Sequence, residues 1–292
     1  MFQRVEIIQW VQGFENAFFD WFFDAVSWFG EEYFYIVVLG LIYWAINKRF
    51  GAFVAMALAT GIAFNNVLKD IIAADRPFVT HGEDVITNKR PGTATGMSFP
   101  SGHVQNSGTF FFAIALYLKQ RVWLVVAIVM TVLMMISRMY LGVHYFEDVL
   151  VGAILAIITA VVLHALYARF AQDEKTLMRF YVVLALIFLP FFFILQGNDF
   201  FRGYGILVGL VVSLAFERRY VGFTHDVALW QKALRVVVGL LLMVIVLTGV
   251  GAAFRPIDNP VFVVNVLGFI RYFLVAFIGF GIYPMAFNRF KF

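Results

Sequence analysis

Apolar residues fill most of this chain in long stretches that charged residues interrupt only briefly. A bilayer core about 30 Å thick takes roughly 20 mostly apolar residues per helix. By that measure the pattern predicts an all-α polytopic membrane bundle of nine spanning helices. They run Tyr33–Ile46, Phe53–Leu68, Val104–Leu118, Val122–Tyr140, Val149–Tyr167, Phe180–Leu195, Tyr204–Phe216, Leu234–Phe254 and Val261–Met285. The first, third and seventh of these are short, so we expect them to borrow flanking residues.

The first 29 residues follow a different pattern, because Glu6, Glu15, Asp20 and Asp24 interrupt a run rich in Trp and Phe. Acidic residues with aromatic residues between them are typical of helices that lie in the membrane interface. The cleavage pattern of a signal peptide is missing, so we expect this segment to be retained. We therefore expect interfacial helices over residues 1–30, a helical core over 31–170 and additional spanning helices over 171–292.

The composition agrees with this pattern. The chain is 62% hydrophobic and 14% charged, with a mean hydropathy of +0.87. A soluble domain has about 45–50% apolar and about 25% charged residues, so a water-soluble fold is excluded. The chain has no cysteine, which excludes a disulfide scaffold.

The net charge of +4 conceals a strong asymmetry between the two sides of the membrane. Alternating the nine spans gives one set of loops a balance of +9 and the other a balance of −5. Loops rich in Lys and Arg stay in the cytoplasm. The long polar loop Ala73–His103 is therefore expected on the extracytoplasmic face, and the C-terminus in the cytoplasm. The charge pattern indicates topology and no nucleic-acid partner, and we expect the membrane to be a plasma membrane of the bacterial type.

Polar groups at membrane depth are costly, and they indicate function by default. Three groups occur, and the predicted topology places all of them on the outward side. They are Lys69 with Arg76-Pro77, Pro100-Ser101-Gly102-His103, and Ser137-Arg138 followed by His144 and Asp148.

The cations among these residues suit a phosphoryl group. The planar guanidinium groups of Arg76 and Arg138 bind phosphate oxygens in pairs, and Lys69 adds a point charge. Ser101-Gly102-His103 leads into a predicted helix start, where backbone N–H groups favour an anion. Asn65 and Asn66 lie one turn before Lys69 and are placed to support it. Together these groups would neutralise charge that builds in an in-line transition state.

The two histidines supply the remaining chemistry. His144 and Asp148 are four residues apart, so in a helix they share one face. A carboxylate on one ring nitrogen fixes the tautomer and leaves the other lone pair for nucleophilic attack. His103 is then available to protonate the leaving alkoxide.

Each group also has an ordinary structural explanation. A His–Asp pair at this spacing is common in structural roles, a Lys or Arg at the end of a span usually snorkels, and Ser-Gly-His can be a helix cap. Their joint occurrence in three loops on one side favours a single active site.

These three motifs resemble the complete signature of the type 2 phosphatidic acid phosphatase (PAP2) superfamily, and the resemblance covers roughly Tyr33–Tyr167. It implies a metal-independent and cofactor-free phosphatase that works through a phosphohistidine. The last four spans resemble the sphingosine-1-phosphate phosphatase and glucose-6-phosphatase branches in architecture alone. The roles that the resemblance implies are His144 as nucleophile, Asp148 as its orienting acid, His103 as general acid, and Lys69, Arg76, Ser101, Gly102 and Arg138 as phosphate-binding residues.

The resulting hypothesis is hydrolysis of a lipid phosphate drawn from the membrane. The candidate substrates are a polyprenyl diphosphate, phosphatidic acid or phosphatidylglycerophosphate, and a sphingoid-base phosphate; a water-soluble phosphate ester stays open. A transferase that passes the same phosphoryl group to a lipid or sugar hydroxyl is one alternative. A transporter is another, although charge within the spans is nearly confined to Arg271. The sequence leaves the oligomeric state open.

Overall fold

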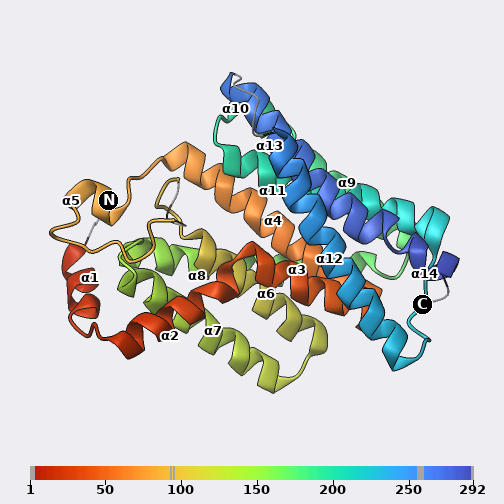
Figure 1. Cartoon of the computed structure of the whole chain (residues 1–292), viewed down its shortest axis with the longest axis horizontal. Coiled ribbons are helices and arrows are strands. Elements are labelled where there is room, and N and C mark those ends of the chain that lie inside the picture. Colours follow the sequence, from red (N-terminus) through yellow and green to blue (C-terminus); the bar gives the residue numbers. More distant parts are fainter. Residues whose placement is uncertain (1–3, 93, 95, 255–259, 291–292) are drawn as a thin grey trace. The chain divides into compact units, whose positions relative to one another are not determined.

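The computed structural model describes residues 4–92, 94, 96–254 and 260–290, and helices dominate this part of the chain (Figure 1). No strand occurs among these residues, so the predicted all-α class is confirmed. The charge balance of the predicted loops includes three residues that lie outside the described part of the chain: Arg255, Asp258 and Lys291. The same holds for the ends of the chain, residues 1–3 and 291–292.

The helices belong to two compact units. Unit 1 comprises Met1–Phe34 and Phe64–Ala165, and unit 2 comprises Tyr35–Ala63 and Leu166–Phe292. The predicted domain limits at residues 30 and 170 stay predictions. Unit 1 contains α1 (Val5–Gln12), α2 (Ala17–Ser27), the short η1 (Trp28–Gly30), the end of α4 (Lys48–Ile72), α5 (Pro77–His81), α6 (Gly102–Leu118), α7 (Arg121–Tyr140) and most of α8 (Phe146–Phe170).

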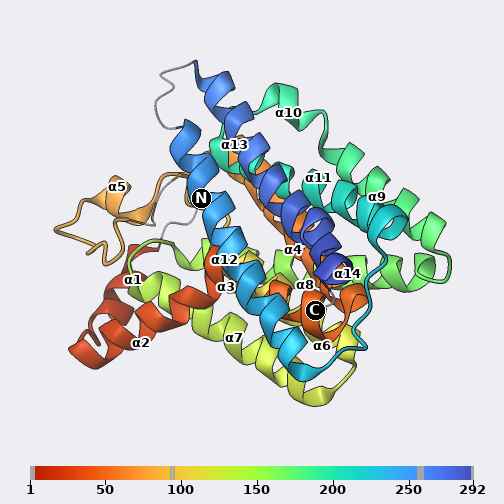
Figure 2. The ribbon, with the colours of Figure 1, turned by 45° about the vertical axis from the view of Figure 1, so that its right-hand side comes forward.

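Unit 2 holds the carboxy-terminal helices. Its elements are most of α3 (Glu32–Leu41), η2 (Ile42–Ile46), the start of α4, α9 (Glu174–Phe188), α10 (Phe191–Ile194), α11 (Asn198–Phe216), η3 (Glu217–Val221), α12 (Leu229–Phe254), α13 (Val261–Phe277), η4 (Ile278–Ile282) and α14 (Met285–Phe290). Within unit 2, α11 and α13 lie side by side, and within unit 1, α6 and α7 do so (Figures 1 and 2). The indole of Trp44 in η2 donates to the carbonyl of Gly279 in η4 at 2.9 Å.

The number of spans is close to the prediction but does not confirm it. Among the residues that the structure describes, seven helices are long and apolar enough to cross a membrane, and eight if α2–η1 and α3–η2, which meet at a bend of 56°, form one broken span. The predicted span Val104–Leu118 forms α6, which has 17 residues. At 1.5 Å per residue it is about 26 Å long, shorter than a bilayer core of about 30 Å.

The amino-terminal segment forms two helices, as predicted, and they pack against the end of α7. Val11 of α1 and Phe23 of α2 share a buried cluster with Tyr140, Leu141 and Val143. The side chain of Asn16 caps α2 by accepting a hydrogen bond from the backbone N–H of Phe19. These contacts hold the first two helices against unit 1; their location in the membrane interface stays a prediction.

Polar side chains in the last spans bond to neighbouring helices or loops. Asn265 of α13 donates to the carbonyl of Gln196 at 2.7 Å, and Arg271 of α13 donates to the carbonyl of Leu247 in α12 at 3.0 Å. Such bonds satisfy polar groups that would be costly in contact with lipid.

Candidate active site

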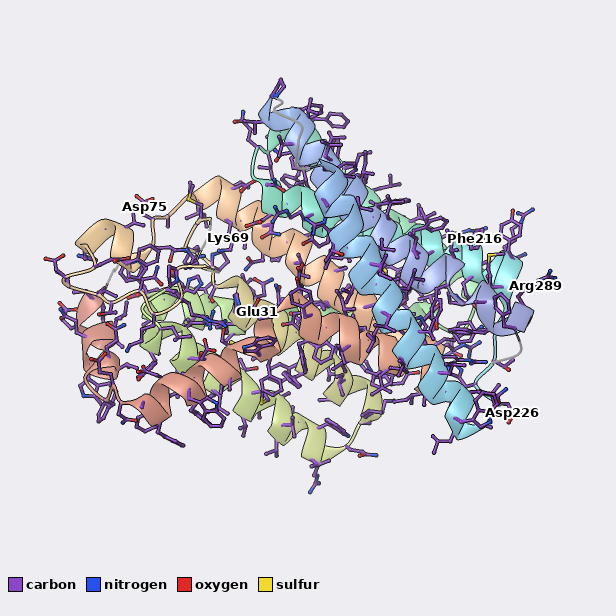
Figure 3. All side chains as sticks on the ribbon, in the orientation of Figure 1. Glu31, Lys69, Asp75, Phe216, Asp226 and Arg289 are labelled. Atoms are coloured by element: carbon purple, nitrogen blue, oxygen red, sulfur yellow. The ribbon has the colours of Figure 1, made fainter. Side chains whose placement is uncertain are left out.

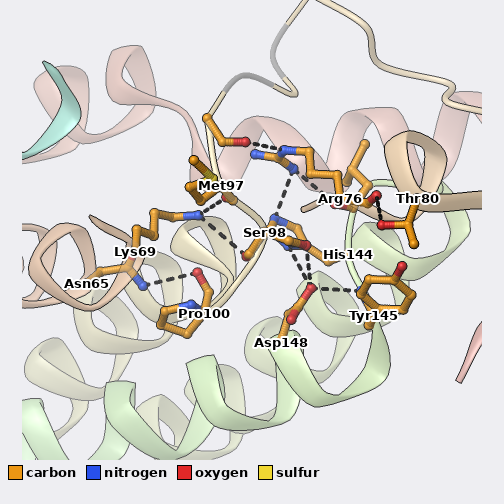
Figure 4. Close-up of polar contacts among 12 residues, drawn as sticks. Asn65, Lys69, Arg76, Thr80, Met97, Ser98, Pro100, His144, Tyr145 and Asp148 are labelled. Carbon is orange, nitrogen blue, oxygen red and sulfur yellow. Dashed lines mark hydrogen bonds and ion pairs between the residues drawn. The ribbon is translucent and has the colours of Figure 1, made fainter. Parts of the chain in front are cut away.

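His144 and Asp148 form a buried pair at the start of α8 (Figure 4). Nδ1 of His144 lies 3.4 Å from Oδ2 of Asp148. The same oxygen accepts the backbone N–H of Tyr145 at 2.9 Å. His144 itself precedes the helix, which begins at Phe146, so the pair is made across a turn and not along a helix face. The prediction of the pair therefore rests on the wrong local geometry, although the two side chains do meet.

The environment of His144 keeps its imidazole neutral. Burial, and the positive charges of Arg76, Lys69 and Arg138, hold the pKa of His144 well below its usual 6.5. With Nδ1 directed at Asp148, Nε2 faces the guanidinium of Arg76, whose Nη1 is 3.4 Å away. A neutral ring with one nitrogen held by a carboxylate and the other facing cations is suited to attack an anion bound there.

Lys69 and Arg76 converge on the loop before Pro100. Lys69 Nζ donates to the carbonyl of Met97 at 2.5 Å and lies 3.5 Å from that of Ser98. Arg76 Nε donates to the carbonyl of Gly96 at 3.0 Å, and its Nη1 to that of Val143 at 2.9 Å. The same short loop thus contacts both cations, and Arg76 ties it to the turn that carries His144.

The start of α6 reaches the same place. The backbone N–H of Ser101 donates to the carbonyl of Asp148 at 3.0 Å. A Cβ atom on Gly102 would lie 3.3 Å from Oδ1 of Asn65 and 3.7 Å from Cε of Lys69, which shows how close the helix start comes to the lysine. Asn65 itself donates to Oε1 of Gln105 at 2.8 Å.

Arg138 and His103 contact the amino-terminal segment. The Arg138 side chain is 2% exposed, and its Nη2 donates to Oγ of Ser27. Nε2 of His103 lies 3.5 Å from Oε1 of Glu31. Among the described residues neither side chain makes a hydrogen bond or ion pair with His144, but the charges of both act on its imidazole.

Two hydrogen-bond donors among the candidate phosphate-binding groups have no acceptor within the described part of the chain. Oγ of Ser101 and Nε of Arg138 are buried and make no hydrogen bond within the described part of the chain. Buried polar atoms without partners are costly, so a partner is expected at each. Oxygen atoms of a phosphoryl group are suitable acceptors for both.

Ser98 belongs to this network, although it was not predicted from the sequence. Ser98 is fully buried, and its Oγ donates to Oδ2 of Asp148 at 2.6 Å and lies 3.4 Å from Nδ1 of His144. It stands just before the Pro100–His103 motif, but no spacing rule separates it from the other polar residues of that loop.

The described residues include no group of three or more His, Asp or Glu side chains that could hold a metal ion. The functional groups described above are the cations, the two histidines and the carboxylate of Asp148. Lys69, Arg76, Ser101, His144 and Asp148 form one connected network, with Gly102 beside it.

Comparison with known proteins places all eight predicted site residues in a matched segment. Residues 50–172 match the PAP2 superfamily, and residues 201–292 match the PAP2 superfamily phosphatase, transmembrane extension. The chain is 29% identical over 168 residues to a probable sphingosine-1-phosphate phosphatase of Dictyostelium discoideum, which covers 53% of this chain and 40% of that protein.

Two microbial relatives are similar over shorter segments. An undecaprenyl-diphosphatase of Sulfolobus acidocaldarius is 30% identical over 132 residues, 44% of this chain and 62% of that protein. Phosphatidylglycerophosphatase B of Bacillus subtilis is 31% identical over 129 residues, 40% of this chain and 58% of that protein. The chain therefore matches less than two thirds of the length of each of these three relatives.

Proposed function

Because the chain belongs to the PAP2 superfamily, we propose that this integral membrane protein is a phosphatase that hydrolyses the phosphate ester or diphosphate of a membrane lipid. The three relatives described above are named for lipid phosphate substrates with unlike lipid parts. The phosphoryl group is the feature that these substrates share, and the site presents its charged residues to that group.

The observation that carries the proposal is the orientation of His144. Its Nδ1 is held by Asp148, and its Nε2 lies 3.4 Å from Nη1 of Arg76. A phosphoryl group bound by Arg76 would therefore lie next to the nucleophilic nitrogen. A second nitrogen base, His103, stands at the start of α6.

The reaction follows in two steps. In the first, Nε2 of His144 attacks phosphorus, the bond to the lipid oxygen breaks, and that oxygen takes a proton from His103. In the second, His103 takes a proton from water, the water oxygen attacks phosphorus, and the phosphorus–nitrogen bond breaks. Asp148 stabilises the positive charge on His144 in the intermediate, while Lys69, Arg76 and Arg138 neutralise the phosphoryl oxygens.

Release of inorganic phosphate from a panel of lipid phosphates tests this proposal. We expect release by the purified protein, unchanged by EDTA and abolished in H144A. H164A is the matched control, because His164 lies on α8 more than four turns beyond Asp148, and it should keep its activity. Full activity in H144A would refute the assignment of the nucleophile. Transfer of labelled phosphate to a lipid or sugar hydroxyl, without free phosphate, would show a transferase instead.

We also propose that the site opens on the extracytoplasmic face of a bacterial-type plasma membrane, with the C-terminus in the cytoplasm. The support is the excess of Lys and Arg on the opposite side of the predicted topology.

A further inference from the structure

The junction between α2 and α3 lies against His103. Figure 3 labels Glu31 at this junction, and its Oε1 is 3.5 Å from Nε2 of His103. A Cβ atom on the preceding Gly30 would lie only 2.7 Å from Cδ2 of the His103 ring. Two consecutive residues of the amino-terminal segment therefore contact the histidine, one through its backbone and the other through its charge.

Arg90 holds Glu31 in this place. Its Nη1 donates to Oε1 of Glu31 at 2.8 Å and to Oγ of Ser27 at 2.7 Å, and its Nε pairs with Asp24 at 2.7 Å. Ser27 in turn accepts a hydrogen bond from Arg138. A carboxylate fixed by a half-buried guanidinium loses little further entropy when it pairs with a neighbouring imidazolium.

An imidazole can act as an acid only when it carries a proton, and the cationic neighbours of His103 disfavour that proton. Burial lowers the pKa of the His103 imidazole to about 4, and the positive charges of the buried Arg138 and Arg76 act in the same direction. Glu31 provides the negative charge that acts in the opposite direction. Nε2 makes no hydrogen bond within the described residues, and Oε1 of Glu31 is the acceptor placed to receive its N–H when the ring is charged.

We propose that Glu31 is the positioning residue of the general acid: its carboxylate orients the His103 ring and pairs with the imidazolium that gives its proton to the lipid oxygen. This inference rests on the proposed phosphatase function. Glu31 lies outside residues 50–172, the segment that matches the superfamily, so the amino-terminal segment would complete the active site in addition to any role at the membrane surface.

With Nε2–H directed at Glu31, Nδ1 of the His103 imidazolium gives its proton to the lipid oxygen as the phosphorus–oxygen bond breaks. The neutral ring then takes a proton from the attacking water in the second step. Glu31 stays ionised throughout, and no further reactant is required.

The test compares E31Q with E83Q on two substrates. Glu83 is an exposed carboxylate in the same polar loop region as Arg90, and its substitution should leave the activity unchanged. The substrates are an alkyl lipid phosphate, whose leaving oxygen needs a proton, and p-nitrophenyl phosphate, whose leaving group departs without one. General acid catalysis contributes about 10²–10⁴-fold, and a partial loss of it should lower kcat for the lipid by about 10–100-fold in E31Q.

We expect the loss for p-nitrophenyl phosphate to be less than about threefold, because its leaving group needs little help from an acid. The alkaline limb of the pH–kcat profile should move to lower pH in E31Q, because the neutral amide no longer favours a proton on His103. E31D keeps the charge and should keep the wild-type position of that limb. Inhibition by inorganic phosphate serves as the check that E31Q still folds around its anion site.

The outcomes separate the two proposals. A wild-type protein that hydrolyses neither substrate would refute the phosphatase function itself. An active wild type with E31Q equal to E83Q would overturn the role of Glu31 alone. Equal losses on both substrates with an unmoved pH profile would show a purely structural role, and would also overturn the inference. If E31Q does not fold, E31D decides: an alkaline limb displaced from the wild-type position despite the retained charge would refute the proposal.

Discussion

Substitution of Ser98 by alanine tests whether the loop before Pro100 holds the carboxylate of Asp148 in position for the proposed reaction. In the structure Ser98 Oγ donates to Oδ2 of Asp148 at 2.6 Å, and both side chains are buried. A hydrogen bond to a charged group contributes about 1.5–3 kcal/mol. Asp148 keeps the backbone N–H of Tyr145 as a partner in S98A, so the carboxylate is loosened and not released.

The loosened carboxylate should orient His144 less well. Since 1.36 kcal/mol corresponds to a factor of ten in rate, loss of the lower value, about 1.5 kcal/mol, would reduce kcat by about tenfold. The effect on KM should be smaller, because Ser98 Oγ contacts the His–Asp pair rather than the phosphate-binding cations. Phosphate release over a range of lipid concentrations in mixed micelles measures both quantities.

Ser107 provides the matched control. It is also fully buried, but its Oγ bonds only to the carbonyl of Val104 in the preceding turn of α6, at 3.4 Å. S107A should therefore keep the wild-type kcat. Equal kcat in S98A, S107A and the wild type would refute the reasoning that Ser98 orients Asp148, whereas a loss of thermal stability in S98A without any loss of kcat would confine Ser98 to a structural role.

Three further predictions concern pH, packing and topology. Because His144 takes up a proton only below its lowered pKa, the midpoint of the acidic limb of the pH–kcat/KM profile should lie well below pH 6.5. A midpoint at or above 6.5 would contradict the lowering of the His144 pKa by burial and by the nearby cations. G108A should lower the stability measured by thermal unfolding in detergent by about 1–3 kcal/mol, because its Cβ would lie 2.7 Å from that of Ala156, whereas G92A meets nothing within 4 Å and should be neutral. Since the chain has no cysteine, E83C and Q172C can be labelled singly; a membrane-impermeant maleimide should label only E83C on intact cells, and the reverse pattern would invert the topology.

Much of the helical architecture was predictable because long apolar stretches have few alternatives in a membrane. The predicted limits of the spanning helices differ most from the structure where polar residues shorten the apolar stretch. Val104–Leu118 forms a helix as expected, but α6 ends at Leu118 after 17 residues, where Lys119 takes a left-handed conformation, so the helix alone does not reach the length of a typical span. The apolar stretch Tyr33–Ile46 is preceded by α2 across the bend at Glu31, a connection that hydropathy does not reveal.

The site was predictable to the extent that its residues carry the chemistry themselves. Charge and nucleophilicity single out Lys69, Arg76 and His144 in an apolar sequence. Residues that only position other side chains carry no charge or nucleophilic group that would identify them in the sequence. Ser98 is one small polar residue among several in its loop, and its importance comes from a contact with Asp148, 50 positions away. Contacts at that separation depend on the folded chain and leave no local periodicity.

The acidic residues of the amino-terminal segment show how the fold changes the meaning of a pattern. Their spacing among aromatic residues predicts helices at the membrane surface. In the structure Glu15 and Asp20 both pair with Lys89, at 2.9 Å each. Burial alone would lower the pKa of Lys89, but its hydrogen bonds to Asp20 and Glu15 outweigh that effect and raise it.

Two cations beside the proposed phosphate site are paired with carboxylates of the amino-terminal segment. Lys89 and Arg90 lie in the same polar loop as Arg76 and Ser101, and they pair with Glu15, with Asp20 and Asp24 of α2, and with Glu31. The carboxylates of Glu15, Asp20 and Asp24 are about half exposed, and ion pairs with exposed partners contribute no more than about 1 kcal/mol, so their main effect is on position rather than stability. The acidic segment thus fixes the loop beside His103 through Lys89 and Arg90, whereas we propose Lys69, Arg76 and Arg138 for phosphate binding.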